Sequence, residues 1–355
     1  MSDYRNTKKA LSDATTLLQG LIFQKPVAAE DEAQASHREL IDVAVKSFGS
    51  LREQLEYAGK DVVVHPAGGG HMAYKHMLVG SSSQPRPTVF IKQHDPTQFD
   101  DPIREAHSRT YLEKEHAVYQ HLSHHNFSHI PEQFELIGNQ ALLLPALSLE
   151  AGWQWRMPSN DAHRQNYIRQ IIAALTDLQK IPIDDQSLLR DSHAIFLREG
   201  WRDFTALRSQ IEKRLLEIPG SELLLSNLED YAADVDRLDS LVPNVTTHHD
   251  LRQSNIAWHP DEGVRIVDWS WSAAGLPNAD STSFIIDLAK AGHDVSGLLE
   301  YFNPDHAKIL IGFWLAHSTR PANTQNDSVR TQQAVSAIHA DRILSHYFAR
   351  GSGVY

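Results

Sequence analysis

Strand-like and helix-like patterns occupy separate parts of this chain, and their separation limits the fold more than any other feature. "DVVVHPAGGGHMAYKHMLVG" reads as strand, tight glycine loop and strand, and "TVFIKQHD" predicts a third strand. "QFELIGNQALLLPALSL" predicts a hairpin that turns at Gly138 and Asn139. A helical period in "IREAHSRTYLEKEHAVYQHLSHH" lies between them. Residues 61–149 therefore predict a five-stranded unit with one helix after its third strand.

The rest of the chain is dominated by helical patterns. Apolar residues recur every three to four positions in "DAHRQNYIRQIIAALTDLQKI", and comparable patterns continue to about Tyr347. Residues 1–60 also have a polar, helical pattern. We therefore predict an α+β protein with a helical extension (1–60), a β-rich lobe (61–147) and a helical lobe (148–355).

Charge and composition limit the classes of partner. The formal net charge of −12 disfavours binding to nucleic acid or to an anionic membrane, and no apolar run is long enough to span a bilayer. The first residues lack the apolar core of a signal peptide. The chain has no cysteine, which excludes disulfides, thiolate catalysis and cysteine-ligated zinc. These features predict a cytoplasmic protein.

The stretch Thr246–Ser272 interrupts the helical region with polar residues placed around short apolar runs. Asp250 and Asn255 are separated by "LRQS", and Asp268 follows the strand-like "VRIV". Each residue taken singly suits a turn. Taken together, carboxylate and amide oxygens are suitable ligands for Mg²⁺, and a nearby carboxylate that binds no metal can accept a proton from a hydroxyl group.

A second group of residues suits a phosphate-bearing ligand. The backbone N–H groups of Gly68, Gly69 and Gly70 could approach phosphates, and Lys92 adds a positive charge within an apolar strand. The alternatives are a plain hairpin turn for the glycines and an edge-strand lysine that reaches solvent.

The motifs H-x-D-x-x-x-x-N and I-V-D-W resemble the aminoglycoside phosphotransferase branch of the protein-kinase-like fold. Here they read His248-His249-Asp250, Asn255 and Asp268-Trp269. The resemblance covers residues 60–315 and implies a two-lobed fold with an antiparallel N-terminal sheet. The activity that it implies is ATP- and Mg²⁺-dependent phosphorylation of a hydroxyl group on a small molecule, such as an antibiotic, a sugar or an amino alcohol.

The resemblance also implies roles for single residues. Asp250 resembles the catalytic base, and Asn255 and Asp268 resemble the Mg²⁺ ligands. Lys92 resembles the lysine that contacts the α- and β-phosphates, held by a helix glutamate. For that glutamate the helical face favours Glu115 over Glu113 and Glu105. The glycine loop would cover the phosphates, Asp287 would lie beneath the catalytic loop, and the adenine would meet the backbone around Pro145, Ala146 and Leu147.

Some features depart from the family or leave alternatives open. His249 stands where the family commonly has glycine, and His248 is better explained as a structural loop histidine than as a proton carrier. The chain end lacks the acidic cluster that aminoglycoside enzymes tend to have. A catalytically silent, nucleotide-binding scaffold is the main alternative. A zinc hydrolase built on histidines is a third, since four lie within "HLSHHNFSH", namely His121, His124, His125 and His129.

Overall fold

The computed structural model of this chain contains two compact units. It describes residues 62–67, 74–81, 88–94, 102–138, 140–183, 192–320 and 327–348. The first unit combines the described residues up to Pro158 with Ala257–Ser270, and the second combines Ser159–Ile256 with the described residues from Trp271 onward. The predicted extension 1–60 and the loop Gly68–Gly70 lie outside the described residues. Those two predictions, and the domain boundary at residue 147, stay predictions.

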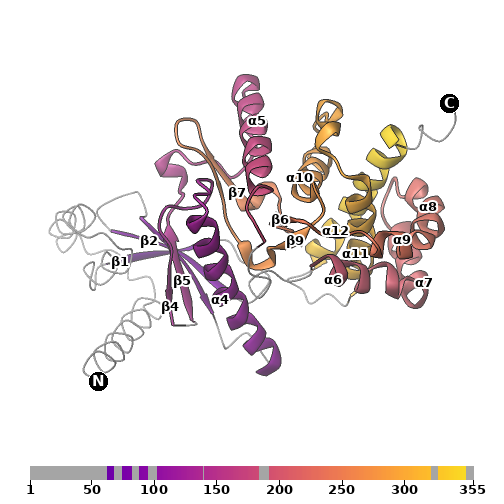
Figure 1. The fold of residues 1–355 in the computed structure, drawn as a ribbon, viewed down its shortest axis with the longest axis horizontal. Coiled ribbons are helices and arrows are strands. Elements are labelled where there is room, and N and C mark those ends of the chain that lie inside the picture. The colour runs from indigo at the N-terminus through magenta and orange to yellow at the C-terminus, as the bar shows by residue number, and fades with distance from the viewer. Residues whose placement is uncertain are drawn as a thin grey trace. The chain divides into compact units, whose positions relative to one another are not determined.

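The first unit is built on a five-stranded antiparallel sheet in the order β1-β2-β3-β5-β4. In this register Lys92 of β3 lies opposite His76 of β2 and Leu142 of β5. The single helix of this region, α4, packs on β3, β4 and β5 (Figure 1). The prediction of an antiparallel sheet with one helix after its third strand is confirmed. The elements are β1 (Val62–Ala67), β2 (Tyr74–Ser81), β3 (Val89–His94), α4 (Pro102–His124), β4 (Glu135–Ile137) and β5 (Ala141–Pro145).

The inward face of α4 follows the expected helical period. Leu112, Val118, Tyr119 and Leu122 are fully buried, and Glu115 lies on the same face. A two-stranded sheet of β7 (Ile256–His259) and β8 (Gly263–Ile266) joins this unit, because the Ile266 N–H donates a hydrogen bond to the His129 carbonyl. The end of β8 and the residues that follow it are thereby attached to the segment after α4.

The second unit is mostly helical, as predicted. Its largest helix–helix contact joins α11 to α12, and α10 packs on both (Figure 1). A short antiparallel pair, β6 (Val245–Thr247) and β9 (Ala273–Gly275), carries the polar stretch that follows Thr247. None of the described helices is long and apolar enough to span a bilayer. The helices are α5 (Asp161–Leu178), α6 (Ser192–Arg198), α7 (Phe204–Leu216), α8 (Glu222–Ala233), α9 (Val235–Asp239), α10 (Ala279–Lys290), α11 (Pro304–Ser318) and α12 (Asp327–Ile343).

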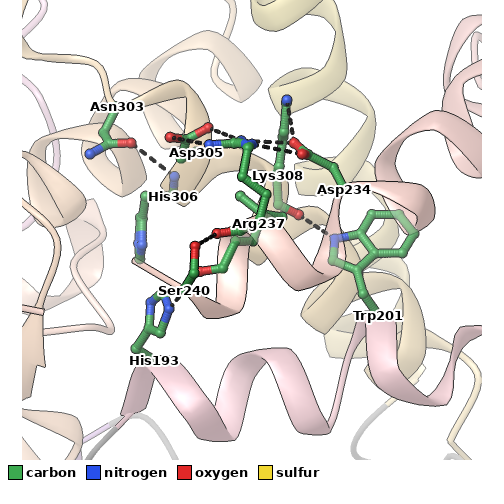
Figure 2. Close-up of polar contacts among 10 residues, drawn as sticks. His193, Trp201, Asp234, Arg237, Ser240, Asn303, Asp305, His306 and Lys308 are labelled. Atoms are coloured by element: carbon green, nitrogen blue, oxygen red, sulfur yellow. Dashed lines mark hydrogen bonds and ion pairs between the residues drawn. The ribbon is translucent and has the colours of Figure 1, made fainter. Parts of the chain in front are cut away.

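A polar network fixes α9, the short helix that precedes β6. Figure 2 shows Arg237 between Asp234 and Asp305, with its Nη2 2.8 Å from Asp234 Oδ2. Lys308 of α11 also reaches Asp234, at 2.8 Å. Single exposed ion pairs contribute little to stability, but linked pairs with bidentate arginine geometry contribute more. The network therefore ties the segment before the catalytic-loop candidate to α11.

Candidate active site

Lys92 lies in the first unit between two carboxylates. Its Nζ is 2.7 Å from Glu115 Oε2 and 2.7 Å from Asp268 Oδ1. The ammonium group also lies 4.9 Å from the centre of the Tyr74 ring, within range of a cation–π interaction. Of the three candidate glutamates, Glu115 is the one that contacts this lysine. Strand, helix and the segment after β8 thus converge on a single cation.

Burial and charge act in opposite directions on this cluster. Burial by itself would lower the pKa of Lys92, but the carboxylates of Asp268 and Glu115 outweigh burial and raise that pKa. Burial raises the pKa of Glu115, while Lys92 and the Trp269 backbone N–H favour its ionised form. Lys92 is therefore a permanent cation whose position is fixed by two anions.

Asp268 is the exposed member of the cluster. Its side chain is 37% exposed, whereas that of Glu115 is 1% exposed. Its backbone has a φ of 68°, an unusual conformation for a residue with a Cβ atom. The next residue, Trp269, is fully buried and donates from Nε1 to the Ile266 carbonyl at 2.9 Å. The buried indole anchors this turn and leaves the Asp268 carboxylate accessible to a cation.

The segment Pro145–Leu147 leaves β5 with some backbone groups already engaged. The Ala146 N–H donates to the Thr88 carbonyl at 3.0 Å, and the Leu147 carbonyl accepts from Trp155 Nε1 at 2.8 Å. Within the described residues, no hydrogen bond engages the Ala146 carbonyl or the Leu147 N–H. An acceptor and a donor one residue apart suit the edge of an adenine ring.

In the second unit, one buried aspartate of α10 holds the start of the polar loop. Asp280 accepts from the N–H of His248 at 2.6 Å and from the N–H of His249 at 2.9 Å. The next N–H, that of Asp250, donates to Nδ1 of the buried His248 ring at 3.2 Å. Burial raises the pKa of Asp280, and the two N–H groups counteract that rise. Three consecutive N–H groups are thus fixed, and His248 has a structural contact.

Asp250 and Asn255 face each other across the loop. Asn255 Nδ2 donates to the Asp250 carbonyl at 2.8 Å and lies 3.3 Å from Asp250 Oδ2. The Asn255 side chain therefore presents its Oδ1 in another direction, which suits a metal ligand. The Asp250 side chain is 36% exposed, and Arg252 Nη2 lies 3.2 Å from its Oδ2.

Asp287 supports the far end of the same loop. It accepts from the Gln253 N–H at 3.0 Å and pairs with Lys290 at 2.9 Å. Burial would raise the pKa of Asp287, but Lys290 and Gln253 outweigh burial and lower it. Asp280 and Asp287 therefore fix the two ends of the loop from one helix. The sequence identified only Asp287, because an acidic residue in the first turn of a helix, such as Asp280, is common without any special contact.

Each unit, taken by itself, offers one side-chain oxygen donor of a kind suited to Mg²⁺. Asp268 supplies an accessible carboxylate, and Asn255 supplies an amide oxygen fixed by its own hydrogen bonds. Mg²⁺ prefers such oxygen ligands and completes its shell with water and phosphate. The histidines of the zinc alternative lie elsewhere, with His121 and His124 in the last turn of α4. Among the described residues, no three histidine, aspartate or glutamate side chains are grouped to hold a metal ion.

Comparison with known proteins gives one family and several structures of the same fold. Residues 98–307, more than half of the 355, match the family described as "Phosphotransferase enzyme family". The AMP-bound complex of a spectinomycin phosphotransferase is 12% identical with a TM-score of 0.50, covering 86% of this chain and 98% of that chain. A search of curated proteins gave no match.

Two further kinases were also found among the solved structures. A choline kinase from Streptococcus pneumoniae is 13% identical with a TM-score of 0.49, covering 78% of this chain and 94% of that chain. An ethanolamine kinase from Plasmodium vivax is 12% identical with a TM-score of 0.45, covering 89% of this chain and 95% of that chain.

Proposed function

Because this chain belongs to the phosphotransferase enzyme family, we propose that it transfers the γ-phosphoryl group of ATP to a hydroxyl group of a small molecule. The observation that carries the proposal is the Lys92 cluster, in which one buried ammonium group contacts both Glu115 and Asp268. Such a cation is held in place before any ligand arrives, which is the requirement for binding a triphosphate in a defined position.

We assign nucleotide binding to the first unit. Lys92 would neutralise the α- and β-phosphates, with Glu115 fixing its position. The Ala146 carbonyl and the Leu147 N–H would meet the adenine, and the glycine loop Gly68–Gly70 would cover the phosphates. Asn255 and Asp268 would hold Mg²⁺, which neutralises charge on the phosphate oxygens when it is bound.

We assign proton transfer to the second unit. Asp250 would accept the proton of the acceptor's hydroxyl group while the oxygen of that hydroxyl group forms a bond to the γ-phosphorus. The bond between that phosphorus and the bridging oxygen breaks, and ADP leaves. Asp280 and Asn255 hold the backbone and the carbonyl of this loop, so Asp250 needs little rearrangement to act. In phosphoryl transfer such positioning and charge neutralisation supply most of the catalysis.

A small-molecule acceptor fits the sequence better than a protein acceptor, because no Ala-Pro-Glu segment follows Asp268. A screen of sugars, amino alcohols and hydroxyl-bearing antibiotics by coupled ADP release tests the activity. At least one acceptor should raise ADP release well above the background with ATP alone. The Asp250→Asn variant should keep its affinity for Mg²⁺·ATP but lose turnover by about a thousandfold or more.

The alternative, a silent nucleotide-binding protein, makes a different prediction in the same experiments. Mg²⁺·ATP would raise the melting temperature by mass action, yet no acceptor would increase ADP release. Asp250→Asn would then have no effect on any measured rate. The paired Lys92, the proposed base Asp250 and the amide of Asn255 are all present in this chain. Their joint presence favours an enzyme over a silent nucleotide-binding protein.

A further inference from the structure

The residue directly before the proposed base has an unusual backbone. His249 has a φ of 65°, in the left-handed region that glycine adopts freely and that asparagine, aspartate and histidine adopt more often than other residues do. A histidine in this conformation is strained unless its surroundings hold it there. The contacts of its side chain therefore bear on how Asp250 is placed.

The imidazole of His249 is buried among three elements of the second unit. Its Nε2 lies 3.1 Å from the Ala274 carbonyl in β9, so this nitrogen carries the proton and donates it. The ring meets Phe196 of α6 edge to face, with 5.3 Å between centres. On another side, His306 of α11 lies 6.0 Å away, centre to centre.

β9 has a glycine, Gly275, beside the His249 ring. A Cβ atom at Gly275 would lie 3.0 Å from His249 Cε1 and 2.6 Å from the side chain of Thr247. Both approaches are closer than a methyl group normally tolerates. The glycine in β9 thus makes room for the imidazole, as expected if the ring has a defined place.

The neighbouring histidine is suited to packing against this ring. His306 lies in the first turn of α11, where Asn303 accepts its backbone N–H (Figure 2). Its ring is buried, and burial lowers the pKa of His306 well below the usual value. A neutral ring beside His249 causes no repulsion between like charges.

We propose that the His249 imidazole is a positioning group for Asp250. By donating to the Ala274 carbonyl and packing on Phe196, the ring holds the left-handed turn that fixes the direction of the next side chain. This inference rests on the proposed function, because Asp250 is the proposed base. The competing explanation is that the position needs only a residue that tolerates positive φ.

Four variants of His249 separate the two explanations. His249→Gly relieves the backbone and removes the ring, and His249→Asn tolerates positive φ but is too short to reach the Ala274 carbonyl. His249→Gln tolerates positive φ less well than Asn does, but its longer side chain can bring an amide N–H to the Ala274 carbonyl. His249→Ala removes the ring and keeps the strain. A positioning ring predicts that kcat falls in the order His, Gln, then the three variants without a donor to Ala274, namely Asn, Gly and Ala, with a loss on the order of ten- to a hundredfold in Gly.

The competing explanation predicts the reverse, with Gly and Asn equal to or better than His, and with the two variants that keep the strain, Gln and Ala, the poorest. The KM for ATP and the Kd for Mg²⁺·ATP should change less than twofold under the proposal, since the residues assigned to the nucleotide and to Mg²⁺ are all unchanged in these variants. Asn126→Gly is the matched control, because Asn126 also has a left-handed backbone, with φ 58°, and its side chain is exposed. That control should leave kcat unchanged.

Hydrogen exchange tests the proposal without requiring turnover. In His249→Gly the amides of His249 and Asp250 should exchange about tenfold faster than in the wild type, and His249→Gln should restore part of the protection. Unchanged exchange in Gly, or better protection in Asn than in Gln, would overturn the role of the ring. If the wild type shows no turnover with any acceptor, the proposed function fails, and the exchange result still decides whether the ring holds this loop.

Discussion

Removing the charge of Lys92 should destabilise the first unit strongly. In Lys92→Met, Glu115 remains buried with a single backbone donor, the Trp269 N–H, and loses its cation. Breaking a buried ion pair from one side typically costs about 3–5 kcal/mol. Loss of the Asp268 contact adds about 0–1 kcal/mol, because that carboxylate is partly exposed. The expected loss is thus about 3–6 kcal/mol in the free energy of unfolding of this unit.

The loss should depend on pH with a definite sign. Without Lys92, the folded protein binds a proton on Glu115 more readily than the unfolded chain does, since burial raises the pKa of that carboxyl group. Stability of the variant should therefore fall as the pH rises from acidic toward neutral. A second change, Glu115→Leu in the Lys92→Met background, should recover most of the stability, because an apolar side chain of similar size replaces the isolated charge.

Hydrogen exchange of β3 and α4, measured by mass spectrometry, reports the opening free energy of this unit by itself. The wild type, the two single variants and the double variant form a thermodynamic cycle whose coupling energy should be about 2 kcal/mol or more. The reasoning fails if Lys92→Met stays within about 0.5 kcal/mol of the wild type or if the double variant is no better than Lys92→Met.

Three further predictions follow from single contacts. Asp280→Asn should lower kcat at least tenfold with little change in the Kd for Mg²⁺·ATP, because the two backbone N–H groups donate to different carboxylate oxygens and an amide group has only one oxygen. An unchanged kcat would contradict this. Burial lowers the pKa of His317 to about 4, so about 3 kcal/mol of stability, present above pH ~6.5, should be lost as the pH falls toward 4. Urea titrations should show a weaker pH dependence in His317→Gln, and an equal slope would refute the assignment. Trp155→Phe should weaken Mg²⁺·ATP binding about fivefold in calorimetry, because it releases the Leu147 carbonyl from its hydrogen bond. Unchanged affinity would show that Pro145–Leu147 does not contact the adenine.

Local patterns were sufficient to predict the elements of this fold. The alternation around Lys92 and the helical period through Leu112 and Glu115 are properties of adjacent residues, so strand and helix could be recognised from the chain alone. The helical period also favoured Glu115 among three candidates, since it shares a face with Leu112, Val118 and Leu122, which are all buried in α4.

Contacts between distant residues were not predictable in the same way. Asp280 holds the N–H groups of residues more than thirty positions earlier, and nothing in "GLPNADS" distinguishes it from an ordinary acidic residue at a helix start. Ala257–Ser270 is likewise joined to the first unit by backbone hydrogen bonds to residues far away in the sequence, His129 and Gln154. The left-handed backbone of His249 and of Asp268 depends on side-chain packing that the sequence does not express.

Tracing the γ-phosphoryl group tests the proposed function most directly. ATP with heavy oxygen in its γ-phosphoryl group would be incubated with Mg²⁺, the protein and an acceptor found by the screen, and the products analysed by mass spectrometry. We predict that the label appears in a phosphate ester on the acceptor's hydroxyl oxygen, and that Asp250→Asn abolishes this product. Label found wholly in inorganic phosphate, or remaining in ATP with every acceptor, would contradict the account.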